Sequence, residues 1–282
     1  MFSKIAMNLE KEKYMITSTS NPKIKNLMQL QKKGKARREQ QCFVVEGIKM
    51  VLEAPEDRLK EIYMSESFSG HSEYREAVLK KAKAAGAYAE IVSDKVFRDT
   101  SDTMTPQGVM AVVASELWDW KTLVSKKTGQ AKLFLILESL QDPGNLGTVI
   151  RTGEGAGIDG IILNRTTVDP YMPKVIRSTM GSAYRVPVAA ADDLTEVVSE
   201  MRRQGIGVYA AHLQGSEDYC RKDYTKDTCF MIGNEASGLT DCLTEMASGY
   251  IRIPMAGQVE SLNAGIAAAL LMYEAKRQRN FQ

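Results

Sequence analysis

Residues 133–147 have the sequence LFLILESLQDPGNLG, and this stretch decides the fold. Its first five residues, Leu133–Leu137, form an apolar run that a Pro-Gly loop ends. A short apolar run bounded by turn residues predicts a buried strand. Residues 145–156 then predict a helix and residues 160–163 a second strand. Alternation of strand and helix is typical of a mostly parallel sheet with both faces covered.

The same alternation continues from this stretch to the C-terminus. Strands are predicted at residues 186–188, 208–211, 229–232 and 251–253, and a helix at residues 192–204. The last helix is predicted from an apolar stripe on one face, made of Leu262, Ile266, Ala269, Leu270 and Tyr273.

The N-terminal half predicts a second, smaller α/β unit. Asn21-Pro22 has the pattern of a helix N-cap and first turn. Strands follow at residues 42–45, 62–64, 91–92 and 109–113, and a helix at residues 73–85. The length of 282 residues favours two domains. We therefore expect domains at 1–115 and 132–282, joined by a linker at 116–131.

Composition excludes several classes of protein. Hydrophobic residues make up 44% and charged residues 26%, as in globular proteins rather than disordered or collagen-like ones. The four cysteines form no CxxC pair, and neither His71 nor His212 lies at ligand spacing from them, so we expect free thiols and no metal site. No apolar run has membrane length, and residues 1–15 lack a secretory pattern. We expect a cytoplasmic protein.

Charge is concentrated at the N-terminus. Residues 1–41 hold ten Lys or Arg against three Glu, so this segment carries +7 while the whole chain carries only +2. Such asymmetry indicates an anionic partner, although a solvated helix face has the same composition. The candidate contacts are Lys23, Lys25, Lys32, Lys33, Lys35, Arg37 and Arg38.

Three loops follow predicted strands and combine Gly or Pro with polar side chains. They lie at residues 138–147, 233–239 and 254–263. Parallel α/β sheets bind ligands beyond the carboxyl ends of their strands, so we expect the site here. Taken one at a time, the polar residues have simpler interpretations. Arg151 could be an exposed helix arginine and Glu235 a helix-start acid, and Asn145, Ser261 and Asn263 could be local helix caps.

A literal G-x-G-x-x-G occurs at Gly155–Gly160. The dinucleotide-binding fingerprint requires a strand before the glycines and a helix after them. The order is reversed here, since a helix is predicted before and a strand after. We therefore expect these glycines to end a helix and permit close packing, and we disfavour a nicotinamide- or flavin-dependent oxidoreductase.

Together, the loops make the sequence resemble the SpoU (TrmH) family of RNA 2′-O-ribose methyltransferases in the SPOUT superfamily. Three motifs match in order: Asn145-Leu-Gly147 with Arg151, Gly233-Asn234-Glu235 with Gly238-Leu239, and Ile253-Pro254-Met255 followed by Ser261-Leu262-Asn263. Residues 16–51 are similar to the substrate-binding domain that often precedes the catalytic one. Gly153 and Gly155 depart from the family, in which alanines are more usual.

The resemblance implies an α/β fold whose C-terminal part forms a deep trefoil knot, and a homodimer. It implies S-adenosyl-L-methionine as cofactor, bound at Ala211, Gly233, Ile253, Met255 and Leu262. It also implies that Arg151 activates the ribose hydroxyl and that Asn145, Glu235, Ser261 and Asn263 lie near the reacting groups. The implied substrate is ribosomal or transfer RNA, which the basic N-terminal residues would contact.

The implied chemistry suits these residue types. A sulfonium supplies a reactive methyl group without a metal, and a guanidinium can stabilise an alkoxide as it develops. Arginine resists deprotonation, so Arg151 is a poor base. We expect Arg151 to orient the ribose hydroxyl and stabilise the developing negative charge, while a phosphate or water takes the hydroxyl proton. Two alternatives stay open: methylation of a base, and an RNA-binding or ribosome-assembly factor without catalysis.

Overall fold

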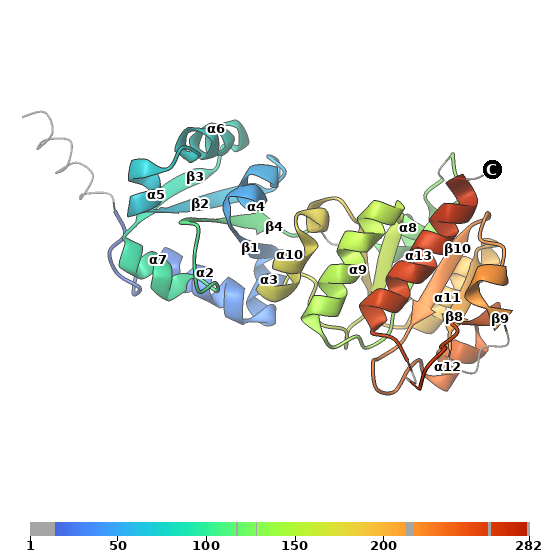
Figure 1. Ribbon diagram of the computed structural model, residues 1–282. Coiled ribbons are helices and arrows are strands. Elements are labelled where there is room, and N and C mark those ends of the chain that lie inside the picture. The colour runs from blue at the N-terminus through green and yellow to red at the C-terminus, as the bar shows by residue number, and fades with distance from the viewer. Residues whose placement is uncertain (1–14, 117, 128, 213–216, 259–260, 281–282) are drawn as a thin grey trace, which may run out of the picture. The chain divides into compact units, whose positions relative to one another are not determined.

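The computed structural model describes residues 15–116, 118–127, 129–212, 217–258 and 261–280, so the N-terminal residues 1–14 and their charges lie outside the described part. The chain forms two compact units (Figure 1). The first comprises the chain up to Ser115 together with Tyr171–Arg177. The second comprises Glu116–Pro170 and the chain from Ser178 onward.

The first unit contains a four-stranded sheet in the order β1-β4-β2-β3. Only the β2–β3 pair is parallel; β4 pairs antiparallel with both β1 and β2. The strands are β1 (Cys42–Glu46), β2 (Leu59–Ser65), β3 (Tyr88–Val92) and β4 (Val109–Ala114). The helices are α2 (Pro22–Lys32), α3 (Gly34–Gln40), α4 (Ile48–Glu53), α5 (Glu66–His71), α6 (Arg75–Ala85) and α7 (Asp94–Thr100). The predicted small α/β unit is confirmed.

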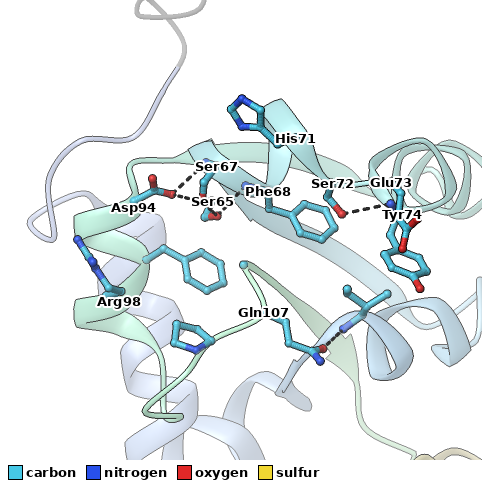
Figure 2. Close-up of a pocket in the computed structure, with 14 residues that line it drawn as sticks. Ser65, Ser67, Phe68, His71, Ser72, Glu73, Tyr74, Asp94, Arg98 and Gln107 are labelled. Atoms are coloured by element: carbon cyan, nitrogen blue, oxygen red, sulfur yellow. Dashed lines mark hydrogen bonds between the residues drawn. The ribbon is translucent and has the colours of Figure 1, made fainter.

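Local sequence signals explain where these helices begin and end. The Asn21 side chain accepts a hydrogen bond from the Lys23 amide at 2.9 Å, which caps α2 in front of Pro22. Gly86 ends α6 in the left-handed conformation, with φ 62°. Helix α2 buries Ile24 and Leu27 in the core of the unit. A pocket lies between α5, α7 and the loop that precedes β4 (Figure 2).

A short segment of the C-terminal half packs within the first unit. It runs from Tyr171 into α10 (Pro173–Thr179). The Tyr171 ring lies 4.7 Å from the Phe43 ring, centroid to centroid. Arg177 forms an ion pair with Asp102. The chain therefore leaves the second unit after Pro170 and re-enters it at Ser178.

The second unit contains a seven-stranded sheet in the order β7-β6-β5-β10-β8-β11-β9. Every neighbouring pair is parallel, as predicted. The strands are β5 (Leu133–Leu137), β6 (Gly160–Asn164), β7 (Val188–Ala191), β8 (Gly207–Ala211), β9 (Glu217–Asp218), β10 (Thr228–Ile232) and β11 (Gly249–Arg252). The predicted bounds of β7 and β11 are wrong by one to three residues: β7 runs from Val188 to Ala191, and β11 ends before Ile253.

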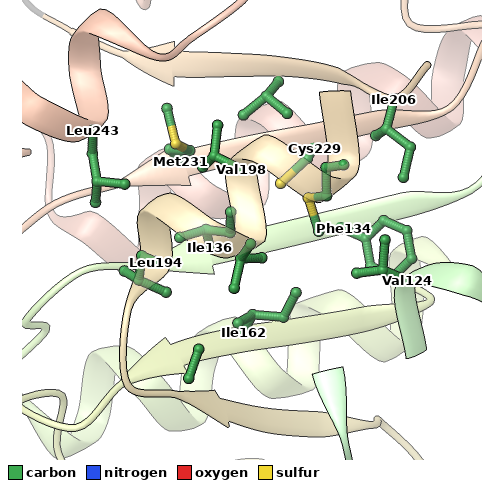
Figure 3. Close-up of a cluster of buried hydrophobic side chains, with 14 of the residues drawn as sticks. Val124, Phe134, Ile136, Ile162, Leu194, Val198, Ile206, Cys229, Met231 and Leu243 are labelled. Carbon is green, nitrogen blue, oxygen red and sulfur yellow. The ribbon is translucent and has the colours of Figure 1, made fainter. Parts of the chain in front are cut away.

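Helices cover both faces of this sheet. They are α8 (Trp120–Ser125), α9 (Pro143–Ala156), α11 (Leu194–Arg203), α12 (Asp241–Glu245) and α13 (Ala264–Asn280), with short 3-10 turns η1 (Ser182–Tyr184) and η2 (Tyr219–Arg221). On one face, α8, α11 and α12 pack on strand residues such as Phe134, Ile136 and Met231 (Figure 3). Helices α9 and α13 pack against each other (Figure 1). The LFLIL run is buried throughout, and each such side chain contributes about 1.5–3 kcal/mol.

Two features of the second unit differ from the expectation. The segment after Glu116 contains a helix, α8, whose Leu123 and Val124 are buried in the core. The predicted last helix is present as α13, but the apolar stripe that indicated it is partly exposed, since Ile266 is 49% and Tyr273 48% exposed. The buried residues of α13 are instead Ala264, Gly265, Ala268, Leu271, Met272, Glu274 and Ala275. Helix α13 is apolar on more than one side, so the spacing of its apolar residues does not identify the side that is buried.

Candidate functional site at the carboxyl edge of the parallel sheet

Four neighbouring strands end at one edge of the sheet. Strands β5, β10, β8 and β11 are adjacent and parallel, so their carboxyl ends lie side by side. They end at Leu137, Ile232, Ala211 and Arg252. The three loops chosen from the sequence follow β5, β10 and β11. The predicted convergence of these loops is therefore confirmed, although they are separated by up to about 120 residues of sequence.

Three polar side chains join the loops directly. The Asn145 Nδ2 donates to Glu235 Oε1 at 3.0 Å. The Asn263 Nδ2 donates to Asn145 Oδ1 at 2.7 Å. Asn145 thus stands between the loop after β10 and the segment before α13. We call Glu235, Asn145 and Asn263 the bridging trio.

Each member of the bridging trio is also held by its own backbone surroundings. Asp142 caps α9 and accepts from the Asn145 amide at 2.8 Å, which places Asn145 in the first turn. The Asn263 side chain accepts from the Gly265 and Ile266 amides at 2.9 and 3.3 Å. Asn263 therefore serves as a cap for α13, while Asn145 is not the cap of α9. Glu235 lies in a turn and does not begin a helix.

The hydrogen bonds of Glu235 keep it charged. Partial burial by itself would raise the pKa of this carboxyl. The hydrogen bond from Asn145 and those from nearby backbone amides, including that of Gln141 at 3.4 Å, outweigh burial and hold the pKa below its ordinary value. Glu235 is consequently an anion at neutral pH. It is suited to orienting donors and poorly suited to accepting a proton.

The loop after β10 is closed by its own backbone. Asn234 and Gly238 exchange both amide-to-carbonyl hydrogen bonds, at 3.0 and 2.9 Å. A Cβ at Gly233 would lie 2.0 Å from the Gly238 carbonyl carbon, so the two segments touch backbone to backbone. Gly238 itself has φ +70°. This closure requires glycine at position 233 for space and at position 238 for conformation.

Two sets of hydrogen bonds that join the first loop to the second loop and its end were not predicted from the sequence. Glu138 is buried and accepts from the Thr240 amide and hydroxyl at 2.8 and 2.9 Å. The Asn234 Nδ2 donates to the Ser139 carbonyl at 2.9 Å. The available signal was a carboxylate directly after a fully apolar strand, since a buried carboxylate needs nearby donors.

Arg151 and Ser261 stand apart from these hydrogen bonds. Arg151 lies on α9 with an exposed side chain and makes no hydrogen bond or ion pair with the described residues. Ser261 is also exposed and precedes α13 by three residues, so it is not the helix cap. The structure brings Asn145, Glu235 and Asn263 together and leaves Arg151 and Ser261 open to solvent.

The expected cofactor residues lie along the same edge. Ala211 ends β8, Gly233 follows β10 and Ile253 follows β11. Ala211, Ile253, Met255 and Leu262 are half-buried, and Gly233 is buried. Sites for small organic ligands are lined mostly by apolar side chains with a few polar groups. The strand ends at this edge offer apolar side chains of this kind. No group of three or more His, Cys, Asp or Glu side chains suited to a metal occurs among the described residues.

The interpretation of the G-x-G-x-x-G stretch is confirmed. Helix α9 ends before Gly157, which adopts φ 80°, and β6 begins at Gly160. A Cβ at Gly160 would lie 2.4 Å from a Leu123 methyl carbon. These glycines end a helix and permit packing, as expected.

The basic residues of α2 and α3 differ in their surroundings. Lys25, Lys32, Lys33, Lys35 and Arg38 are exposed. Lys23 is exposed but forms an ion pair with Glu90. Arg37 is buried, and its guanidinium donates to the Leu30 and Gln31 carbonyls at 2.7 and 2.9 Å. Arg37 thus satisfies the C-terminal carbonyls of α2 and is not available on the surface.

Among the described residues, no helix has the length and apolar character of a membrane span.

Family models match both halves of the chain. Residues 132–273 match the SpoU rRNA Methylase family, and residues 21–111 match the MRM3-like substrate binding domain.

Similar proteins cover nearly the whole chain. The 23S rRNA (guanosine(2553)-2′-O)-methyltransferase RlmP of Bacillus subtilis is 31% identical over 93% of this chain and 98% of its own length. The AdoMet-bound rRNA methyltransferase from Sinorhizobium meliloti is 34% identical with TM-score 0.82, over 93% of this chain and 97% of that one. AviRb from Streptomyces viridochromogenes, a SpoU methyltransferase solved in complex with AdoMet, is 26% identical with TM-score 0.81, over 93% of this chain and 100% of that one.

Proposed function

The chain belongs to the SpoU rRNA Methylase family, and we propose which of its residues perform each part of that family's reaction. The protein is an S-adenosylmethionine-dependent RNA 2′-O-methyltransferase. The observation that carries the assignment of residues is the bridging trio, which ties together three loops at the edge where this fold binds its ligand.

S-adenosylmethionine supplies an electrophilic methyl group when bound. The apolar side chains of Ala211, Ile253, Met255 and Leu262 suit its adenine and methylene groups, and the backbone at Gly233 suits its polar edges. Gly233 admits this close backbone approach because no side chain intervenes. The trefoil knot expected for the family would enclose the same loops.

The acceptor hydroxyl must lose its proton as it attacks. We assign Arg151 to stabilising the developing alkoxide, because its guanidinium is exposed and makes no bond within the described residues. Asn145, Glu235 and Asn263 position the loops, and Ser261 is available to the substrate. The low pKa of Glu235 argues against a role as base, so a substrate phosphate or water accepts the proton.

We also propose that the protein forms a homodimer through the exposed apolar side of α13. Ile266 and Tyr273 lie on that side, seven residues apart. A Cβ at Gly155 would lie 2.7 Å from the Tyr273 hydroxyl, so the exposed side of α9 adjoins that of α13. Arg151 precedes Gly155 by one helical turn, which brings the assigned arginine to the proposed interface.

Sedimentation analysis tests the dimer. Ile266→Glu should shift the sedimentation coefficient to that of a 31.3 kDa monomer, because it buries a charge in the interface. Ser125→Glu is the control, since Ser125 is exposed on α8, which covers the opposite face of the sheet. Equal sedimentation of both variants and the wild type would reject this interface.

The proposed substrate is ribosomal RNA in the cytoplasm, contacted by Lys25, Lys32, Lys33, Lys35 and Arg38. These side chains are exposed on α2 and α3, in the part of the chain that matches a substrate-binding domain. Phosphate contacts of this kind give affinity without requiring a particular base.

The function is tested by mapping RNA from cells with and without the gene. A ribose methyl group blocks alkaline cleavage, so one rRNA position should become cleavable when the gene is deleted. A change in base modification with unaltered cleavage would indicate base methylation instead. Calorimetry with S-adenosylmethionine separates both from a non-catalytic RNA-binding factor, which would show no binding.

A further inference from the structure

The first unit contains a cavity that neither the bridging trio nor the basic helices use. It has a volume of about 800 Å³. Its walls come from the end of β2, from α5 and the residues after it, from α7, and from the loop that precedes β4 (Figure 2). A volume of about 300–1,000 Å³ is usual for sites that hold a small organic ligand. All of its lining residues lie within residues 21–111, which match a substrate-binding domain.

The backbone at the base of this cavity is fixed. Gly108 has φ +83°, and a Cβ there would lie 2.8 Å from both the Phe68 Cβ and the Ser65 Oγ. The Gly108 carbonyl accepts from the Ser65 amide at 2.8 Å. The Gln107 Oε1 accepts from the Ile48 amide at 2.8 Å. The cavity is therefore built by the fold, with the Gln107 side chain anchored by its oxygen.

The lining combines aromatic rings with polar groups. Phe68 and Phe97 are buried, while Tyr74 is 43% exposed and His71 is also exposed. The Gln107 Nε2 and the Arg98 guanidinium donate no hydrogen bond to the described residues, although the Arg98 charge interacts with the Asp94 carboxylate. This set offers ring faces for stacking, an amide donor for a base edge and a cation for a phosphate.

The charges on the rim limit what the cavity can hold. Arg98 and His71 share it with Glu73 and Asp94. Asp94 is engaged, since its Oδ1 accepts from the Ser67 amide and hydroxyl at 3.0 and 2.8 Å. Two carboxylates disfavour a ligand with several phosphates, whereas one base with one phosphate brings a single phosphate to Arg98.

We propose that this cavity binds an unpaired nucleotide of the RNA substrate, stacked on Tyr74, with Gln107 at the base edge and Arg98 at the phosphate. The proposal rests on the proposed function, because it takes the substrate to be RNA. It adds a site that recognises single-stranded RNA beside the basic surface of α2 and α3. Stacking of a base on an aromatic ring is worth about 1–3 kcal/mol.

The test uses the full-length protein and a fluorescein-labelled eight-nucleotide oligo(U) that contains one 4-thiouridine. Tyr74→Leu combined with Arg98→Gln should weaken oligo(U) binding at least tenfold. The matched control combines Tyr88→Leu with Arg75→Gln, since both residues are exposed in the same unit and line no part of the cavity. Both double variants change exposed side chains and should keep the wild-type Tm.

Photocrosslinking and a conservative variant sharpen the result. Crosslinks should map to residues 65–74 or 97–108. Gln107→Glu keeps the oxygen that accepts from Ile48 but replaces the amide donor, so it should also weaken binding. Crosslinks confined to α2 and α3, equal affinities for both double variants, or no binding of oligo(U) by the wild type would each overturn the proposal. S-adenosylmethionine calorimetry on the same preparations tests the proposed function separately, because this cavity does not contribute to that binding.

Discussion

The two candidate regions of this protein are built in opposite ways. At the edge of the parallel sheet, Asn145 bonds side chains that lie 90 and 118 residues away in the sequence. On α2 and α3, most of the basic side chains extend into solvent, and Lys23 forms an ion pair with Glu90. One region is an interlocked network and the other is a set of independent charges.

The two regions should therefore respond differently to amino-acid substitution. In an interlocked network, one substitution displaces several groups, because bonded neighbours share their geometry. Independent surface charges act additively and are screened by salt. We therefore expect abrupt losses from changes at the sheet edge and graded losses from changes on the helices.

Gly233→Ala should have the largest effect. Its Cβ would lie 2.0–2.2 Å from backbone atoms of Gly238 and Leu239, so the loop after β10 cannot keep its shape. We expect S-adenosylmethionine binding to fall below detection by calorimetry. Gly257→Ala, which meets no atom within 4 Å in the neighbouring loop, is the control. Near-normal binding by the Gly233 variant would show that the network tolerates displacement.

Arg151→Ala should lower the rate of methyl transfer by about 10²–10³. Cofactor affinity should stay unchanged, because the exposed Arg151 side chain makes no hydrogen bond or ion pair with the described residues. Single-turnover kinetics with saturating RNA measure this rate directly. Arg203→Ala removes an exposed arginine from α11 and should have no effect. An Arg151 variant with the wild-type rate would remove the arginine from the mechanism.

Glu235→Gln should slow transfer by about tenfold, because one of the two accepting oxygens becomes an NH2 donor that faces either the Asn145 Nδ2 or the Gln141 amide. The pKa of Glu235 lies below its ordinary value of 4.5, so its stabilising charge is fully present above that pH. The stability difference between wild type and variant should be constant from pH 5 to 8. It should shrink as the pH falls through the lowered pKa. Thermal unfolding across this range measures it, and a difference that grows in acid would contradict the assignment.

Replacing Lys32, Lys33 and Lys35 by Gln should have the smallest effect on the rate at saturating RNA. The slope of log affinity against log salt should become shallower by about 2–3, one phosphate contact being worth about 0.7–0.9. The control replaces Arg75, Lys80 and Lys83, exposed residues of α6. If both triple variants have the same slope, α2 and α3 are not the RNA-binding surface.

Much of this architecture could be predicted because its signals are local. The LFLIL run, Asn21-Pro22 and Gly86 each act through their immediate neighbours, and they mark elements that the structure contains. The convergence of the loops followed from a rule of parallel sheets that needs no side-chain detail.

Pairings between distant side chains could not be predicted. Nothing in the spacing indicates that Glu138 binds Thr240, or that Arg37 turns inward to the end of α2 while Arg38 stays exposed. The side of α13 that faces the core was likewise ambiguous, because apolar residues occur on both. These choices depend on packing partners that the fold supplies from elsewhere.

The segment Tyr171–Arg177 limits where this chain can be cut into separate domains. Since it lies within the first unit but belongs to the sequence of the second, no single cut yields two complete modules. A recombinant fragment starting at residue 116 would carry an orphaned helix, whose Val175 and Ile176 are buried in the whole protein. A genetic exchange of N-terminal domains between relatives would also need to transfer these seven residues.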